Sequence, residues 1–264
     1  MTHDFFARGW CRFGHDPALA AWVDHARPHA RATVTAPEYS QWHRYGGTWF
    51  AGVNALPNDR RGIVGTEGPA LRGTAVSFIR DRLGLHDVSW DRGQVSVCYP
   101  GYPQPMDGET PGALRYRRER DAAHVDGLHP VGPKRRRHLK EHHGFILGIP
   151  VTETSEEASP LVVWEGSHKM IRAAFQKRYT DLAPESWNGT DVTEAYQTVR
   201  QEVFETCPRV VVHAIPGEAY LVHRLALHGV APWSDAATSG PDGRMIIYFR
   251  PEMPGGPEAW LNEP

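Results

Sequence analysis

Apolar side chains recur at two different spacings along the chain, and the change falls near residue 94. Before it, apolar positions at helical spacing are Leu19, Trp22, Val23 and Ala26. Asp16-Pro17 supplies an N-cap followed by proline at the first helical position, so we expect a helix over 16–28. A second helix is expected over 69–83, and a strand over 47–53. The first ninety residues are therefore predicted to be mainly helical.

From Gln94 onward the pattern is that of half-buried strands. Val95, Val97 and Tyr99 alternate with Ser96 and Cys98. Further expected strands, punctuated by Pro and Gly turns, cover 144–151, 160–164, 209–215, 219–223 and 244–250. Two helices interrupt them, over 169–179 and 191–204, the second with a capping-box-like start.

Short strands separated by turns, with helices ahead of and between them, predict a mainly β fold with flanking helices. A double-stranded β-helix (a cupin-like jelly roll) fits this order, whereas a doubly wound parallel sheet would need regular strand–helix alternation. We expect one domain over 1–264, with a helical N-terminal part over 1–90 packing on a jelly-roll core over 91–252.

Composition narrows the classes of function. The 264 residues carry 29 Lys and Arg against 31 Asp and Glu, so no basic excess indicates nucleic-acid binding. No apolar run approaches the length of a membrane span, and Met1-Thr2-His3-Asp4 does not begin a secretory signal. Cys11, Cys98 and Cys207 are too few and too scattered for a disulfide framework. We expect a soluble, cytoplasmic protein that acts on a small molecule; the oligomeric state is left open.

The 15 histidines prompt a search for a metal site. His124-Val125-Asp126 is the only His-x-Asp or His-x-Glu triplet in the chain, although chance alone supplies about two in a chain of this composition. A segment that contains His223 and His228 follows about a hundred residues later, and Arg244 opens the last expected strand. Two imidazoles and one carboxylate leave cis positions open on a metal, as in non-haem Fe(II) oxygenases. An arginine nearby can bind a dicarboxylate with two parallel hydrogen bonds.

Several blocks, in this order, make the chain resemble the phytanoyl-CoA dioxygenase family of Fe(II)/2-oxoglutarate-dependent oxygenases. The blocks are His124-Val125-Asp126, the run 145–150, the run 159–169 ending in Gly166-Ser167-His168-Lys169, the segment from His223-Arg224 to His228-Gly229, and Arg244. The resemblance covers roughly residues 90 to 252. It implies a double-stranded β-helix, with Fe(II), 2-oxoglutarate and O₂ as cofactor and cosubstrates.

The resemblance also implies roles for particular residues. His124, Asp126 and His228 would ligate iron, and Arg244 would bind the distal carboxylate of 2-oxoglutarate. The implied reaction hydroxylates an unactivated C–H bond of a small organic molecule. The retained Asp126 disfavours the halogenating branch of these oxygenases, where a small residue stands in its place.

Alternatives remain at several positions. His223 competes with His228 as the distal ligand, and Arg250 shares strand parity with Arg244 as the anchor. The basic run Lys134–Arg137 is either a solvated loop or the border of a site that attracts an acidic substrate. Two other functions are open: a cupin-like metalloenzyme that does not use 2-oxoglutarate, and a non-catalytic small-molecule-binding barrel.

Overall fold

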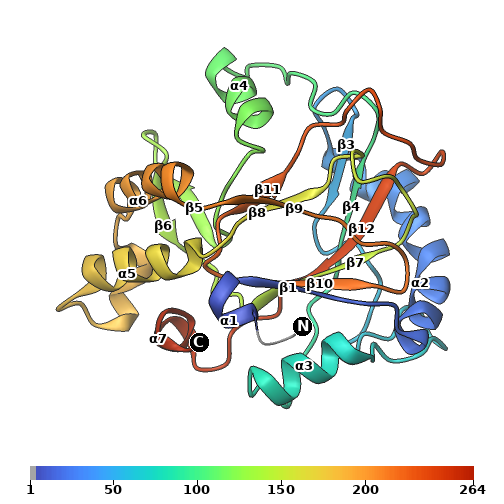
Figure 1. The fold of residues 1–264 in the computed structure, drawn as a ribbon, viewed down its shortest axis with the longest axis horizontal. Coiled ribbons are helices and arrows are strands. Elements are labelled where there is room, and N and C mark those ends of the chain that lie inside the picture. The colour runs from blue at the N-terminus through green and yellow to red at the C-terminus, as the bar shows by residue number, and fades with distance from the viewer. Residues whose placement is uncertain (1–3) are drawn as a thin grey trace.

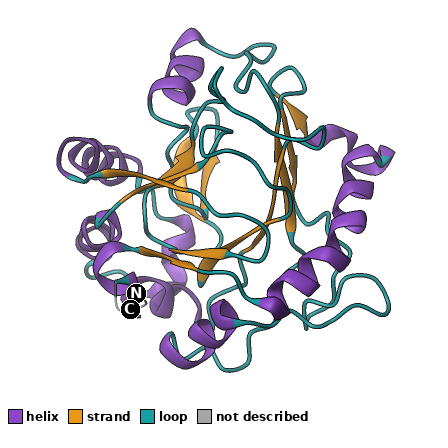
Figure 2. Cartoon of the chain, turned by 45° about the vertical axis from the view of Figure 1, so that its right-hand side comes forward, coloured by secondary structure: helices purple, strands orange, loops and turns teal. Residues whose placement is uncertain are grey.

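Two antiparallel sheets face each other across the interior of the molecule in the computed structural model, which describes residues 4–264 (Figures 1 and 2). The larger sheet has the order β1-β10-β7-β12-β4-β3-β2, and the smaller has the order β11-β8-β9. The strands of the larger sheet are β1 (Trp10–Phe13), β2 (His43–Arg44), β3 (Trp49–Gly52), β4 (Gln94–Cys98), β7 (Phe145–Pro150), β10 (Ala219–His223) and β12 (Arg244–Phe249). Those of the smaller are β8 (Leu161–Trp164), β9 (Arg209–Val212) and β11 (His228–Val230). A separate hairpin joins β5 (Leu128–Val131) to β6 (Arg136–Leu139).

The path of the chain between the two sheets defines the architecture. After β4 in the larger sheet, the chain crosses to form an isolated bridge between His124 and His228 at the edge of the smaller sheet. It returns to the larger sheet as β7, crosses for β8 and β9, returns as β10, crosses for β11 and ends in β12. This alternation is that of a double-stranded β-helix, so the predicted fold class is confirmed.

Helices cover the outer faces of both sheets (Figure 2). They are α1 (Phe5–Arg8), α2 (Pro17–Thr35), α3 (Thr74–Arg82), α4 (Pro111–Glu119), α5 (Ser167–Tyr179), α6 (Thr193–Thr206) and α7 (Gly256–Asn262), with 3₁₀ turns η1 (Pro37–Trp42) and η2 (Pro184–Gly189). Trp22 of α2 packs in one cluster with Leu147 of β7, and Phe175 of α5 packs in another with Val162 of β8. Each sheet is thus buried on both faces, which explains why the central strands are apolar at consecutive positions.

Alternation along a strand separates the outer core from the barrel interior. Leu147 of β7 belongs to the cluster beneath α2, whereas its neighbour Ile146 packs inside the barrel with Val163 of β8 and Tyr248 of β12. On β7 and β12, the even-numbered residues, such as Ile146 and Tyr248, therefore point into the barrel. That parity selects the side chains that can reach a site inside the barrel.

The structure corrects the expectation for the N-terminal third. Besides α2, α3 and β3, which falls within the strand expected over 47–53, this part supplies the unexpected strands β1 and β2 to the larger sheet. The first helix continues through Pro28 to Thr35, because Ala30 and Thr33 are buried against the core beyond the proline. The second begins at Thr74 rather than 69, where the Asp16 carboxylate accepts hydrogen bonds from the Thr74 backbone N–H (2.8 Å) and hydroxyl (2.6 Å).

Two expectations from composition can be compared with the structure. Cys11, Cys98 and Cys207 are free thiols, as expected. Within residues 4–264, none of the helices combines the length and apolar character that crossing a membrane requires. Residues 1–3, on which part of the expectation about the N-terminus rests, lie outside the described residues.

Candidate metal centre

His124 and His228 are brought together by backbone pairing between two remote segments. The His124 N–H donates to the His228 carbonyl (2.8 Å), and the His228 N–H donates to the His124 carbonyl (3.0 Å). On the other side of β11, Val163 of β8 pairs with His228. Gly229 permits this close approach, because a Cβ there would lie 2.1 Å from the Asp121 carbonyl oxygen. The two imidazole ring centroids are 4.6 Å apart as a result.

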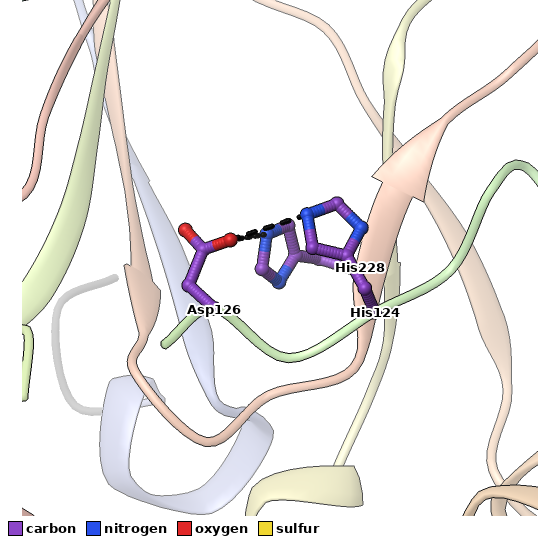
Figure 3. Close-up of side chains that lie close together, drawn as sticks. All are labelled: His124, Asp126 and His228. Carbon is purple, nitrogen blue, oxygen red and sulfur yellow. Dashed lines mark ion pairs between the residues drawn. The ribbon is translucent and has the colours of Figure 1, made fainter. Parts of the chain in front are cut away.

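Asp126 completes a group whose ligand atoms converge (Figure 3). Its Oδ1 lies 3.2 Å from Nε2 of His124 and 3.9 Å from Nε2 of His228. One ligand atom from each of the three residues lies within 4.8 Å of the others. The structure therefore brings together the three residues that the sequence nominated as metal ligands.

The two imidazoles are oriented so that both Nε2 atoms face the carboxylate. Nδ1 of His124 donates to the Ala122 carbonyl (2.9 Å), and Nδ1 of His228 donates to the Ala226 carbonyl (2.9 Å). A proton held on Nδ1 by a backbone carbonyl leaves the Nε2 lone pair available to a metal. Two nitrogen donors and one carboxylate oxygen fit a divalent transition metal with open coordination positions.

Electrostatics keep Asp126 ionised. Burial would raise the pKa of this carboxyl, but Arg250 and the two imidazoles outweigh burial and hold the pKa well below its ordinary value. Nη1 of Arg250 lies 3.2 Å from Oδ2 of Asp126, and its Nη2 donates to the side-chain oxygen of Gln94. Arg250 thus occupies one carboxylate oxygen and leaves the other facing the imidazoles.

The two imidazoles differ in their proton affinity. Burial, together with the neighbouring His124, lowers the pKa of His228 to about 4, so this ring is neutral near neutral pH. For His124, desolvation is outweighed by the hydrogen bond with Asp126, which raises its pKa above the ordinary value. A metal must displace the proton of His124, so metal affinity is expected to rise with pH.

His223, the alternative to His228 as distal ligand, lies away from the metal group. His223, at the end of β10, is buried beside His168, with ring centroids 4.8 Å apart, and Nη2 of Arg172 lies 3.0 Å from its Nε2. His223 is absent from the convergent group, which within residues 4–264 contains only His124, Asp126 and His228.

Arg244 and Arg250 stand at opposite ends of the interior face of β12. Arg244 opens the strand, is buried, and directs Nη2 toward the hydroxyls of Tyr220 (3.4 Å) and Tyr248 (3.5 Å). Its Nη1 is buried without a hydrogen-bond partner in the described residues. Arg250 follows the strand, and its guanidinium contacts Asp126 of the metal group. Strand parity alone does not predict this contact.

Two cavities share His124 and Asp126 in their linings. One, of about 610 Å³, extends into the barrel and is lined by His228, Tyr248 and Leu161; the other, of about 1210 Å³, opens in front of His124 and Asp126. Both are bounded by Arg250 and by Arg117 of α4. The arrangement gives a metal-binding position between a mainly apolar inner chamber and a more polar outer one.

The basic run Lys134–Arg137 divides between the two roles considered for it. Arg136 is held by Asp191 (2.5 Å) and Glu194, whereas Arg135 and Arg137 line the outer cavity. Tyr116 and Tyr196 line that cavity too and were not anticipated. Nothing local marks them in the sequence, because tertiary packing of α4 and α6 brings them to the site.

Neither a scan against protein-family models nor a search of curated proteins found a match. Among solved structures, the chain is similar to the α-ketoglutarate-dependent carbocyclase SnoK from nogalamycin biosynthesis (13% identity, 94% of this chain, 81% of that chain, TM-score 0.48). It is also similar to EctD from S. alaskensis with 2-oxoglutarate and 5-hydroxyectoine (13% identity, 96% of this chain, 74% of that chain, TM-score 0.45). A third similar structure is HygX from Streptomyces hygroscopicus with nickel, 2-oxoglutarate and hygromycin B bound (14% identity, 96% of this chain, 86% of that chain, TM-score 0.43). At these scores the assignment of a metal centre rests on the convergence of His124, Asp126 and His228 within this chain.

Proposed function

We propose that the protein is a single-domain, cytoplasmic Fe(II)- and 2-oxoglutarate-dependent oxygenase of the phytanoyl-CoA dioxygenase type. It would hydroxylate an unactivated C–H bond of a small organic molecule. The observation that carries this proposal is the convergence of two imidazole Nε2 atoms and one carboxylate oxygen from remote segments, at the junction of two cavities. Iron(II) bound there would supply O₂ activation coupled to the oxidative decarboxylation of 2-oxoglutarate.

The residues around the proposed ligands have separate tasks. The Ala122 and Ala226 carbonyls orient the two imidazoles, and Arg250 orients the carboxylate by holding Oδ2. These outer contacts keep three ligands on one side of the metal position and leave the cavity side open to substrate. The apolar lining of the inner chamber limits access of water.

Arg244 is the better anchor for the distal carboxylate of 2-oxoglutarate. Its buried Nη1 lacks an acceptor within residues 4–264, and burying such a donor without a partner costs about 1–3 kcal/mol. A carboxylate extending along the barrel toward Tyr220 and Tyr248 would satisfy this donor. Arg250 is already paired with Asp126 beside the metal position, so its charge stands at the wrong end for a chelating diacid.

Binding under anaerobic conditions tests the proposal in two steps. Metal-free protein is titrated with Fe(II), and the loaded protein is then titrated with 2-oxoglutarate. We expect one Fe(II) per chain and saturable 2-oxoglutarate binding that Arg244→Gln weakens. After admission of O₂, wild-type protein should convert 2-oxoglutarate to succinate, whereas His124→Ala and Asp126→Ala should remain folded and inactive.

The outcomes separate the candidate functions. Unimpaired turnover by His124→Ala or Asp126→Ala contradicts the ligand assignment. Stoichiometric Fe(II) binding without 2-oxoglutarate binding favours a cupin-like metalloenzyme that does not use this cosubstrate. Failure to bind Fe(II) at a pH where the imidazoles are neutral favours a non-catalytic barrel.

A further inference from the structure

The outer cavity carries an uneven distribution of charge. Its lining contains five arginines and five carboxylates, so their formal charges balance. Two of the arginines have a carboxylate partner: Arg117 pairs with Glu109, and Arg250 pairs with Asp126. The remaining three, Arg135, Arg137 and Arg200, have no carboxylate at ion-pair distance within residues 4–264.

The other lining carboxylates are turned to different partners. Glu141 lies 3.0 Å from Nε2 of His143 and 3.2 Å from Nε2 of His129. Asp91 accepts the backbone N–H of Arg250 (2.9 Å), and Asp107 is exposed. Of the charged residues that line the cavity, three arginines and the single carboxylate of Asp107 are thus left without an ion-pair or hydrogen-bond partner of opposite charge within residues 4–264.

Arg137 of β6 and Arg200 of α6 line the same cavity as Tyr116 and Tyr196. The Arg200 guanidinium lies over Tyr116, 5.0 Å from the ring centroid, and over Tyr196, at 5.3 Å. Burial raises the pKa of both phenols, and the charges of Arg200 and Arg137 oppose that rise in each of them. Nη1 of Arg137 donates to the Leu128 carbonyl (3.1 Å), which leaves its other donors available. Both side chains therefore belong to the lining of one cavity.

The two tyrosines connect Arg200 to the metal group. The Tyr116 hydroxyl donates to the Ala123 carbonyl (2.7 Å), and the Val125 N–H donates to the Tyr196 hydroxyl (3.2 Å). Ala123 and Val125 flank His124 in the chain. The Arg200 guanidinium therefore stands one tyrosine ring away from the backbone that carries a proposed metal ligand.

Another part of the lining is mainly aromatic and apolar, with Arg117 lying over the Tyr45 ring. Trp42, Tyr45, Val53 and Met106 line both cavities and so lie where the outer chamber meets the inner one. Tyr45 is held in place by stacking with Trp49 (ring centroids 5.6 Å apart, planes at 2°). A ligand in this cavity could contact both the cations and these aromatic and apolar side chains.

We propose that Arg137 and Arg200 bind the anionic group of the substrate, whose apolar body lies against the wall formed by Trp42, Tyr45, Val53 and Met106. The substrate class is a small organic oxyanion, such as a carboxylate or a sulfate or phosphate ester. The role as a substrate subsite rests on the proposed oxygenase function. Arginine suits this task because its planar donors match two oxygens of one anion.

Binding of benzenesulfonate to the metal- and 2-oxoglutarate-loaded protein under anaerobic conditions tests the proposal. Sulfonate coordinates metals weakly, and saturating 2-oxoglutarate occupies its own anchor, so the measured affinity reports the cationic pair. We expect Arg200→Gln and Arg137→Gln each to raise the Kd about tenfold or more, as loss of a charge-assisted hydrogen bond predicts. Arg118→Gln is the matched control: it removes one exposed arginine charge from α4 outside the cavity lining and should change the Kd less than about twofold. Methyl phenyl sulfone, the neutral analogue, should bind more weakly and equally to all variants.

Three results would overturn the proposal: no saturable benzenesulfonate binding by wild-type protein, an affinity unchanged in Arg200→Gln and Arg137→Gln, or an equal loss in Arg118→Gln. Failure of the oxygenase function is separately visible. Arg200→Gln should bind Fe(II) and 2-oxoglutarate as wild type does, because Arg200 contacts neither the proposed ligands nor Arg244. Sulfonate binding that depends on Arg200 in a protein that takes up no 2-oxoglutarate would support the anion site while contradicting the oxygenase.

Discussion

At Asp126, a single carboxylate has two oxygens with different partners. Oδ2 is 3.2 Å from Nη1 of Arg250, while Oδ1 faces the two imidazoles. The division orients the carboxylate before any metal arrives, which lowers the ordering cost of binding. Arg250 is in turn held by the side-chain oxygen of Gln94 and by an Asp91–backbone hydrogen bond.

Replacing Arg250 should therefore weaken metal binding without removing a ligand. We expect Arg250→Gln to reduce the affinity for Fe(II) or Co(II) by about 10- to 100-fold, as loss of an outer-shell partner typically does. Arg250→Lys keeps the charge but offers one donor group, so an intermediate affinity is expected. Calorimetric titration of the metal-free variants measures the effect. An affinity in Arg250→Gln equal to that of wild type would mean that Asp126 is oriented by something else.

The sequence predicts a residue of the site only where a motif or spacing connects that residue to the others. His124 and Asp126 are two positions apart, and the resemblance to the phytanoyl-CoA dioxygenase family favoured His228 over His223, so these three were predicted to lie together. Arg250, Gln94, Tyr116 and Tyr196 act through contacts across the barrel or between helices. No spacing rule connects them to the metal group, because tertiary packing alone brings them there.

Among the elements, the proposed metal centre depends on the approach of β11 to the segment 121–124. The Val230 N–H donates to the Asp121 carbonyl (2.9 Å), and His228 pairs with His124 through two backbone hydrogen bonds. Gly229 lies between these contacts, and an added Cβ would meet the Asp121 carbonyl oxygen at 2.1 Å. The obstacle is backbone, so a rotamer change cannot relieve it.

Gly229→Ala should consequently separate the two segments. We expect a loss of about 1–3 kcal/mol in the free energy of unfolding, typical of overpacking, together with a marked loss of metal affinity. Gly240→Ala is the matched control, because Gly240 is exposed and its added Cβ would meet nothing within 4 Å; its effect should stay within about 0.5 kcal/mol. Urea denaturation and metal titration test both variants. Equal behaviour of the two would show that close backbone approach at Gly229 is unimportant.

Most central strands could be predicted because alternation and turn residues act locally. The expected strand over 219–223 coincides with β10, and that over 244–250 exceeds β12 by one residue. The first helix was predicted to end at Pro28, yet it continues for seven residues because its far end packs on the sheet. β1 was missed because its four residues become a strand only by pairing with β10.

At the scale of the whole molecule, a second histidine pair links stability to pH. His168 of α5 and His223 of β10 are buried together between the helices and the larger sheet. Burial lowers the pKa of His168 to about 4 and holds that of His223 well below its ordinary value. Both are therefore neutral in the folded protein, whereas in the unfolded chain each takes up a proton near pH 6.5.

The free energy of unfolding should therefore depend on pH. Between about pH 6.5 and pH 4 the unfolded state binds more protons, so the free energy of unfolding falls as pH is lowered through this range. His168 alone should account for a loss of about 2 kcal/mol between roughly pH 7 and pH 5. Urea titrations at the two pH values measure it, and His168→Gln should show a smaller loss than wild type. An identical loss in His168→Gln would rule out His168 as a source.

Crystallography of the protein with Mn(II) and 2-oxoglutarate shows whether His124, Asp126 and His228 bind one metal ion. We expect one anomalous difference peak within bonding distance of both Nε2 atoms and Oδ1 of Asp126. The distal carboxylate of 2-oxoglutarate should contact Arg244. A peak at any other position, or none while the three side chains stay as they are, would mean that these residues do not form a metal site.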